Sequence, residues 1–96
     1  MLVEIYGIDE SAWKCPACHD AKKICEEGQV PYQFFPVLWE ENGQPKHDLE
    51  LIKDIATRAG FTGIHLRYPV IFVDGKNVKL KNLRTYLSRL GYDTEL

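Results

Sequence analysis

The segment Val70–Val73 sets the strongest limit on the fold of this 96-residue chain, because it is apolar at every position. A strand without polar side chains is covered on both faces, so other elements must pack on either side of its sheet. Asp74-Gly75 follows at once, and this dipeptide favours a tight hairpin into a further strand over residues 76–80. We therefore predict a small α/β sheet with helices on both faces.

Local patterns predict the remaining strands and helices. β-branched and aromatic residues predict a first strand over residues 2–6, ended by Gly7, and a second strand over residues 32–38. Apolar residues at helical spacing predict helices over three segments, residues 15–28, 49–60 and 83–91, each of which ends at a glycine.

The connections complete the predicted topology. Residues 39–47, which contain Asn42-Gly43 and Pro45, and residues 61–67 are expected to be surface connections. The predicted order is β-α-β-α-β-β-α, in a single domain over residues 1–96. Its first βαβ unit is parallel and its last two strands are antiparallel, which gives a four-stranded mixed sheet flanked by helices.

The composition limits the partners of the chain. Hydrophobic residues make up 45% and charged residues 27%, which is typical of globular domains and argues against disorder. Lys and Arg number 12 against 14 Asp and Glu, so no basic surplus favours nucleic acid. No apolar run approaches the roughly 20 residues of a spanning helix, and residues 1–6 lack the basic start of a signal peptide. We expect a cytoplasmic protein that binds neither nucleic acid nor membrane.

The motif Cys15-Pro16-Ala17-Cys18 stands where the first strand pattern gives way to a helix. Cys15 is placed at the helix N-terminus, where free backbone N–H groups and the helix dipole lower a thiol pKa from about 8.5 to roughly 3.5–7.5. Lys14 adds a positive charge beside it. Cys18 lies one turn further along, within reach of a mixed disulfide formed at Cys15. These are the parts of a dithiol–disulfide exchanger.

The residues alone leave other interpretations of the cysteines open. Both motif cysteines are also consistent with simple packing as small hydrophobes. A zinc site with His19 and Cys25 is disfavoured, because Cys25 rises about 10 Å beyond Cys18 along a helix. Cys15 to His19 also matches the C-x-x-C-H pattern of covalent haem attachment, which normally forms outside the cytoplasm. Cys25 itself is expected to pack in the core, with regulatory oxidation as the alternative.

Three segments together resemble the glutaredoxins of the thioredoxin superfamily: Ile5-Tyr6-Gly7, Lys14 to Cys18, and Tyr68-Pro69 with the strand and turn that follow. The resemblance covers nearly the whole chain. The middle stretch, from Phe34 to Gly60, is most similar to the short T-even phage glutaredoxins, also called phage thioredoxins. A thioredoxin fold is what this resemblance implies.

The resemblance also implies roles for individual residues. Cys15 is the nucleophile and Cys18 resolves the mixed disulfide. Pro69 is expected to be cis and to face the cysteines, and the backbone of Tyr68 to pair with substrate or glutathione. Lys14 is expected to meet the glycine carboxylate of glutathione, with Pro16 and Ala17 completing the binding surface.

Two positions depart from the family pattern. Ala17 stands where an aromatic residue is common. Residues 78–82, Val-Lys-Leu-Lys-Asn, stand where the family usually has Gly-Gly-x-Asp for the γ-glutamyl end of glutathione. Lys79 and Lys81 would repel its ammonium group and favour its carboxylate.

The expected activity is reduction of protein disulfides and glutathione mixed disulfides by a monomer with no bound cofactor or metal. Glutathione is the expected co-substrate, and either glutathione or a thioredoxin reductase restores the dithiol. The resemblance implies ribonucleotide reductase as an electron acceptor and, for a phage protein, the host cytoplasm as its location. The alternatives are a thioredoxin-like carrier that does not use glutathione, a non-catalytic binding subunit and an iron–sulfur carrier.

Three further features have two interpretations each. His19 is either a proton shuttle or a solvated helix residue. Trp13 either rims the substrate groove or packs on the sheet edge. The basic residues of the C-terminal quarter form either a docking patch for an acidic partner or a solvated face; they are Lys76, Lys79, Lys81, Arg84 and Arg89.

Overall fold

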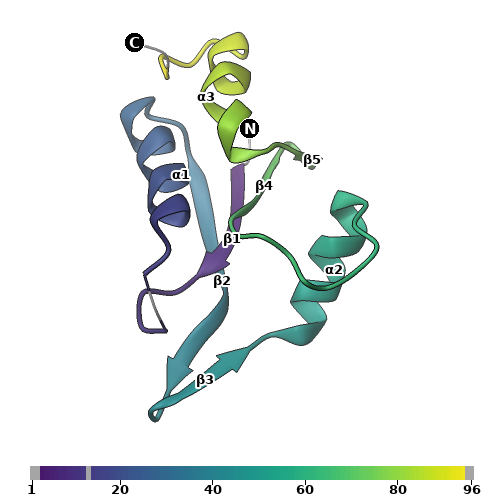
Figure 1. The fold of residues 1–96 in the computed structure, drawn as a ribbon. Helices are drawn as coiled ribbons and strands as arrows, with labels where there is room; N and C mark the ends of the chain where they lie inside the picture. The colour runs from purple at the N-terminus through teal and green to yellow at the C-terminus, as the bar shows by residue number, and fades with distance from the viewer. Residues whose placement is uncertain (1–2, 13, 95–96) are drawn as a thin grey trace.

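The computed structural model describes residues 3–12 and 14–94. The elements within these ranges are β1 (Val3–Ile8), α1 (Pro16–Glu27), β2 (Tyr32–Glu41), β3 (Gln44–His47), α2 (Leu49–Ala59), β4 (Val70–Val73), β5 (Lys76–Asn77) and α3 (Leu80–Arg89). The strands of this part of the chain form a five-stranded mixed sheet in the order β3-β2-β1-β4-β5. Helices α1 and α3 cover one face and α2 covers the other (Figure 1). The predicted α/β class, with helices on both faces, is confirmed.

The first strand lies at the centre of the sheet. β1 pairs parallel with β2 and antiparallel with β4, so that Ile5 lies opposite both Phe34 and Ile71. β4 in turn pairs antiparallel with β5. The predicted parallel β1-α1-β2 unit and the hairpin after Val73 are therefore both present.

Side chains of β4 alternate between the two faces of the sheet, and each face has its own core. Ile71 and Val73 pack with buried residues of α1 and α3. Val70 and Phe72 pack with buried residues of α2 on the opposite face. All four residues are buried, as predicted for a strand covered on both sides.

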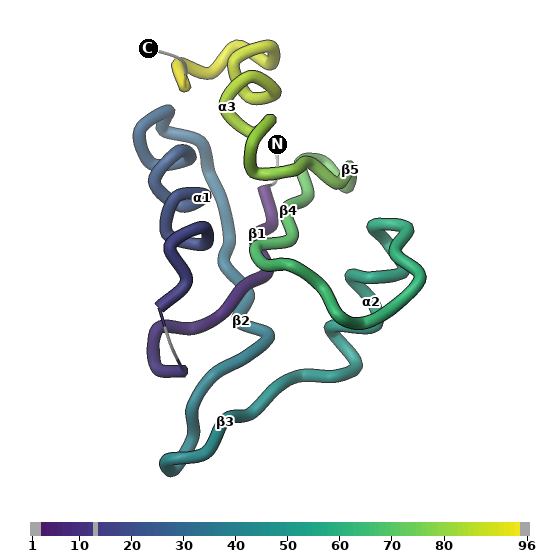
Figure 2. The backbone as a smooth tube through the Cα atoms, in the orientation of Figure 1, coloured from purple at the N-terminus to yellow at the C-terminus, as the bar shows by residue number. Residues whose placement is uncertain are grey.

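The prediction of a four-stranded sheet with a surface loop over residues 39–47 is wrong. β2 continues to Glu41, and β3 pairs with it antiparallel to form a hairpin that extends away from the rest of the sheet (Figure 2). Asn42 and Gly43 form its turn, with φ of 53° and 77°. Positive φ at both positions is what a type I′ turn requires, and Asn-Gly is the dipeptide that accepts it. Pro45 is tolerated because β3 is an edge strand.

Two strand boundaries also differ from those predicted. β1 does not end at Gly7 but continues to Ile8. β5 covers only Lys76–Asn77, because Leu80 already starts α3 and shares the apolar face of Leu83 and Leu87. No helix in the described ranges is both long and apolar enough to cross a lipid bilayer.

Candidate active site

The two motif cysteines lie at the start of α1, joined by a disulfide with Cα atoms 5.2 Å apart. Cys15 is the N-cap, and its Sγ accepts a hydrogen bond of 3.2 Å from the backbone N–H of Cys18. Pro16 occupies the first turn, where a backbone N–H would have no helical partner. Cys18 is 3% exposed, whereas Cys15 is only partly buried. Cys15 is therefore the more accessible cysteine of the pair.

Gly7 allows α1 to approach the central strand at this point. A Cβ atom at Gly7 would lie 2.7 Å from Cys18 Sγ and 3.0 Å from Cε1 of Phe34. The first distance is shorter than a side chain tolerates and the second is unusually tight, so only glycine permits this contact without a shift. In the sequence Gly7 is visible as the glycine after an apolar strand, but local patterns do not predict that it contacts Cys18.

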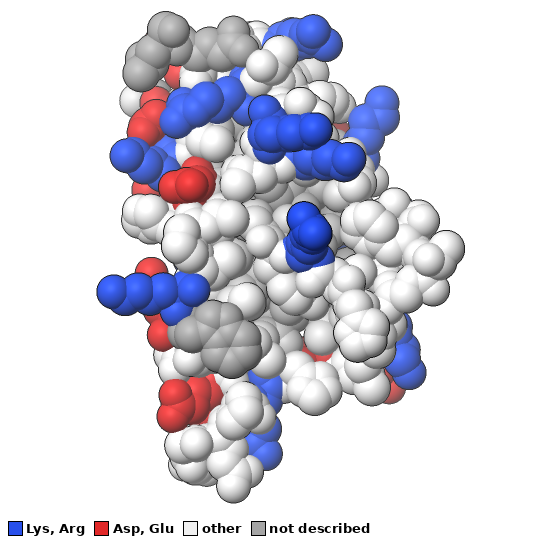
Figure 3. Space-filling model, viewed as in Figure 1, with Lys and Arg blue, Asp and Glu red and all other residues white. Residues whose placement is uncertain are grey.

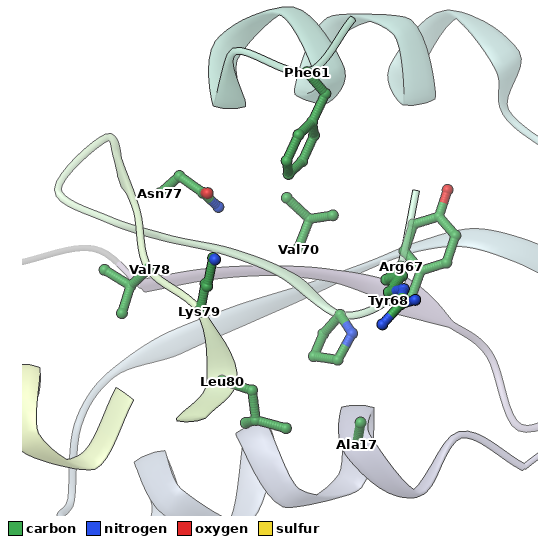
Figure 4. Close-up of a pocket in the computed structure, with 10 residues that line it drawn as sticks. Ala17, Phe61, Arg67, Tyr68, Val70, Asn77, Val78, Lys79 and Leu80 are labelled. Carbon is green, nitrogen blue, oxygen red and sulfur yellow. The ribbon is translucent and has the colours of Figure 1, made fainter. Parts of the chain in front are cut away.

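A proline stands beside the motif, at the entry to β4. The Tyr68–Pro69 peptide bond is cis, as the family resemblance implied. Tyr68 and Pro69 line a groove of about 270 Å³ that reaches the cysteine motif at Ala17 (Figure 4). The groove thus brings together three of the residues predicted to bind substrate.

The other predicted binding residues lie in a second hollow. Lys14, Cys15 and Pro16 line it together with Glu10 and His19, and its volume is about 510 Å³. The predicted set is thereby divided between two hollows that each include residues of the cysteine motif. His19 lies near the motif in this hollow, while Trp13 falls outside the described residues.

Residues that the sequence did not single out complete the first groove. Phe61 and Arg67, on the connection between α2 and β4, also line it, Phe61 near Val70 and Arg67 beside Tyr68 (Figure 4). Val78 and Leu80 form the apolar side near α3. The sequence signal for Phe61 is faint: it is a large aromatic residue in a predicted surface connection. In the structure its side chain is 46% exposed.

The start of α3 carries positive charge and no acid. Lys79 is its N-cap, makes no side-chain capping hydrogen bond, and lines the groove. The first turn of α3 contains no acidic residue. This agrees with the departure from Gly-Gly-x-Asp that was evident in the sequence.

Burial changes the acidity of two groups in this region. It raises the pKa of the Tyr68 phenol, so this hydroxyl stays protonated and neutral at physiological pH. Burial also raises the pKa of the free Cys25 thiol to about 11. Cys25 is 0% exposed and packs in the core against α3 and the sheet, as predicted. Among the described residues, no group of three or more His, Cys, Asp or Glu side chains is placed to hold a metal ion.

The mixed sheet with its covering helices is a thioredoxin-like fold, and the site is a C-x-x-C disulfide at the N-terminus of its first helix. The chain is 39% identical over 95 residues to the "uncharacterized 11.8 kDa protein in Gp55-nrdG intergenic region" of Enterobacteria phage T4, covering 98% of this chain and 92% of the phage protein. The chain belongs to the same family as that phage protein.

A more distant similarity points to the chemistry of the site. The chain is 29% identical over 79 residues to the glutaredoxin of Enterobacteria phage T4, covering 80% of this chain and 87% of the glutaredoxin. No protein-family model matches the chain. The relationship to glutaredoxins predicted from the motifs is thus present as a distant similarity.

Proposed function

We propose that the protein is a dithiol–disulfide oxidoreductase of glutaredoxin type, with Cys15 as the nucleophile and Cys18 as the resolving cysteine. The observation that carries this proposal is the redox pair itself: an accessible cysteine at a helix N-cap, bonded to a buried cysteine beside a substrate-sized groove. The distant similarity to a phage glutaredoxin supports the same chemistry.

In the reduced protein, the Cys15 thiolate attacks one sulfur of a substrate disulfide. A mixed disulfide forms at Cys15, and the other substrate sulfur leaves as a thiolate that takes up a proton. The Cys18 thiolate then attacks Cys15 Sγ, which releases the second substrate thiol and forms the Cys15–Cys18 disulfide. The substrate gains two electrons and two protons, and the protein loses them.

Two reductants can restore the dithiol. Two glutathione molecules would do so in sequence, yielding glutathione disulfide, with Lys14, Tyr68 and Pro69 forming the binding surface together with Pro16 and Ala17. A thioredoxin reductase would instead pass two electrons from NADPH through its own dithiol. We propose ribonucleotide reductase as one protein acceptor, and a monomer acting in the host cytoplasm, on the family resemblance.

One observation favours the second reductant. Lys79 occupies the N-cap of α3, in the segment where glutaredoxins usually carry an acid for the glutathione ammonium group. The second candidate function is therefore a thioredoxin-like carrier that accepts electrons from a flavoprotein reductase without glutathione.

NADPH consumption during reduction of a small mixed disulfide tests the proposal. The assay is run once with glutathione and glutathione reductase, and once with thioredoxin reductase. Turnover in the first assay supports a glutaredoxin, and turnover only in the second supports the carrier. Cys15→Ser should abolish turnover in either case, while Cys25→Ala serves as the matched control and should retain it. Absence of turnover in both assays would contradict the redox function.

A further inference from the structure

The groove beside the cysteine motif continues past Lys79. A third hollow, lined by Lys81 and Tyr86 of α3, shares Asn77, Val78 and Lys79 with the groove that reaches Ala17. We call the two joined hollows the basic groove. One end reaches Ala17, next to the Cys15–Cys18 disulfide, and the other end reaches Tyr86. The two hollows thus adjoin one another along Asn77, Val78 and Lys79.

The charge of the basic groove has one sign. Arg67, Lys79 and Lys81 line it, and none of the described residues along it is acidic. Figure 3 shows Lys and Arg side chains gathered over the region of β5 and α3, while many acidic side chains lie on the α1 side. Since the whole chain is slightly acidic, with a net charge of -2, this surplus is local.

Some cations outside the basic groove are paired with carboxylates, whereas those that line it are not. Arg84 lies 3.2 Å from Glu27, and Arg58 lies 3.1 Å from Glu4. No described carboxylate forms an ion pair with any of the three groove cations. Their charge is therefore available to the acidic groups of a ligand that lies along the groove.

The groove also offers apolar surface close to the disulfide. Pro69, Val78 and Leu80 line it, and Phe61 contributes an exposed ring. A polypeptide segment combines the features that this surface recognises: a backbone, apolar side chains and acidic side chains spaced along its length. A compact ligand with a free ammonium group would instead meet Lys79.

We infer that the basic groove selects protein disulfides whose cysteine is followed or preceded by Asp or Glu, and holds the acidic segment along β5 and the start of α3. This inference rests on the proposed redox function, for which it names the substrate class. Chemically, reduction of such a substrate is the two-electron exchange described above, with the protein dithiol as the sole electron donor.

Three disulfide peptides of one length test the inference: one with Glu residues flanking a cysteine, one with Gln and one with Lys. The protein is reduced with dithiothreitol and desalted, so that a single turnover needs neither glutathione nor a reductase. We expect the acidic peptide to react fastest, by roughly fourfold for each charge placed about 5 Å from a groove cation. At 0.5 M salt the three rates should converge, because screening weakens interactions between exposed charges.

Substitutions assign the effect to the groove. Lys79→Gln combined with Lys81→Gln should lower the ratio of acidic to neutral rates, leaving only the contribution of Arg67. Lys46→Gln is the matched control, because Lys46 is exposed on the edge strand β3, away from the groove, and it should keep the preference. Equal rates for the three peptides would overturn the inference alone, as would a preference that the double substitution leaves undiminished. Failure to reduce any peptide would overturn the redox function and the inference with it.

Discussion

Replacing Gly7 by alanine tests the close contact between the central strand and the cysteine motif. The added Cβ would lie 2.7 Å from Cys18 Sγ and 3.0 Å from Phe34 Cε1. Neither neighbour is a free side-chain end, because Cys18 is bonded to Cys15 and the Phe34 ring packs under Lys22, whose Nζ is 3.8 Å from the ring centroid. The strand or the helix must therefore move.

Overpacking of this kind costs about 1–3 kcal/mol. The smaller entropy of the unfolded alanine chain offsets roughly 0.4–1 kcal/mol of it. We therefore expect Gly7→Ala to lower the free energy of unfolding by about 0.5–2 kcal/mol, which corresponds to a fall in Tm of roughly 2–16 °C for a domain of this size.

The substitution should destabilise the oxidised form more than the reduced form, because a free Cys18 thiol can rotate away from the new methyl group. Each 1 kcal/mol of additional destabilisation of the oxidised form raises the reduction potential by about 20 mV, making the variant more oxidising. Thermal unfolding of both redox forms, and titration against a glutathione buffer, measure these two effects.

Gly63→Ala is the control for the effect of alanine itself. Its Cβ would meet no described atom within 4 Å, and its φ lies outside the left-handed region. The free energy of unfolding of this variant should lie within about 0.5 kcal/mol of that of the parent. A Gly7→Ala protein that melts together with Gly63→Ala in both redox forms would refute the reasoning.

Three further predictions concern other parts of the molecule. Arg58→Met should destabilise the protein by about 1–3 kcal/mol at pH 7, because Arg58 donates two hydrogen bonds to Glu4. That pairing lowers the pKa of Glu4 below 4.5, so the pair contributes to the free energy of unfolding above this pH, and the contribution is lost as the pH falls through the lowered pKa. In urea unfolding from pH 7 to pH 3, the free energy of unfolding of the variant should therefore fall less steeply with acid than that of the parent. Cys25, with a buried thiol of pKa about 11, should resist iodoacetamide at pH 8 until the reduced protein is unfolded, as mass spectrometry would show. Asp48→Ala removes the N-cap of α2 and should cost about 1 kcal/mol in chemical denaturation.

Each of these has an outcome that contradicts it. If the free energy of unfolding of Arg58→Met fell with acid as steeply as that of the parent, the pKa of Glu4 would not depend on the guanidinium. Alkylation of folded protein at Cys25 would mean that the core opens there. An Asp48→Ala midpoint equal to that of the parent would mean that another group caps α2.

The sequence predicted best those elements whose signals are local. The β4–β5 hairpin followed from an apolar run and Asp74-Gly75. The same kind of turn at Asn42-Gly43 was overlooked, because β3 has no buried side chain and so shows no apolar alternation. Pro45 also argued against a strand, although an edge position accepts it.

The site was predictable only where chemistry is carried by a short motif. Cys15 and Cys18 were evident, whereas Phe61 and Arg67 were not, because tertiary packing alone brings their connection to the groove. Gly7 shows the same limit: its importance depends on Cys18, which lies 11 residues further along and meets it only in the folded protein.

The central position of β1 has a consequence for the newly made chain. Its neighbour β2 follows within 41 residues, but its other neighbour, β4, is not complete until residue 73. Chains emerge from the ribosome N-terminus first, so the cysteines and the helix that carries them precede the groove walls supplied by β5 and α3. For that interval the nascent protein holds the cysteine pair without β5 and α3, which supply part of the basic groove. The selectivity that we infer for the basic groove would therefore depend on residues made late in the synthesis of the chain.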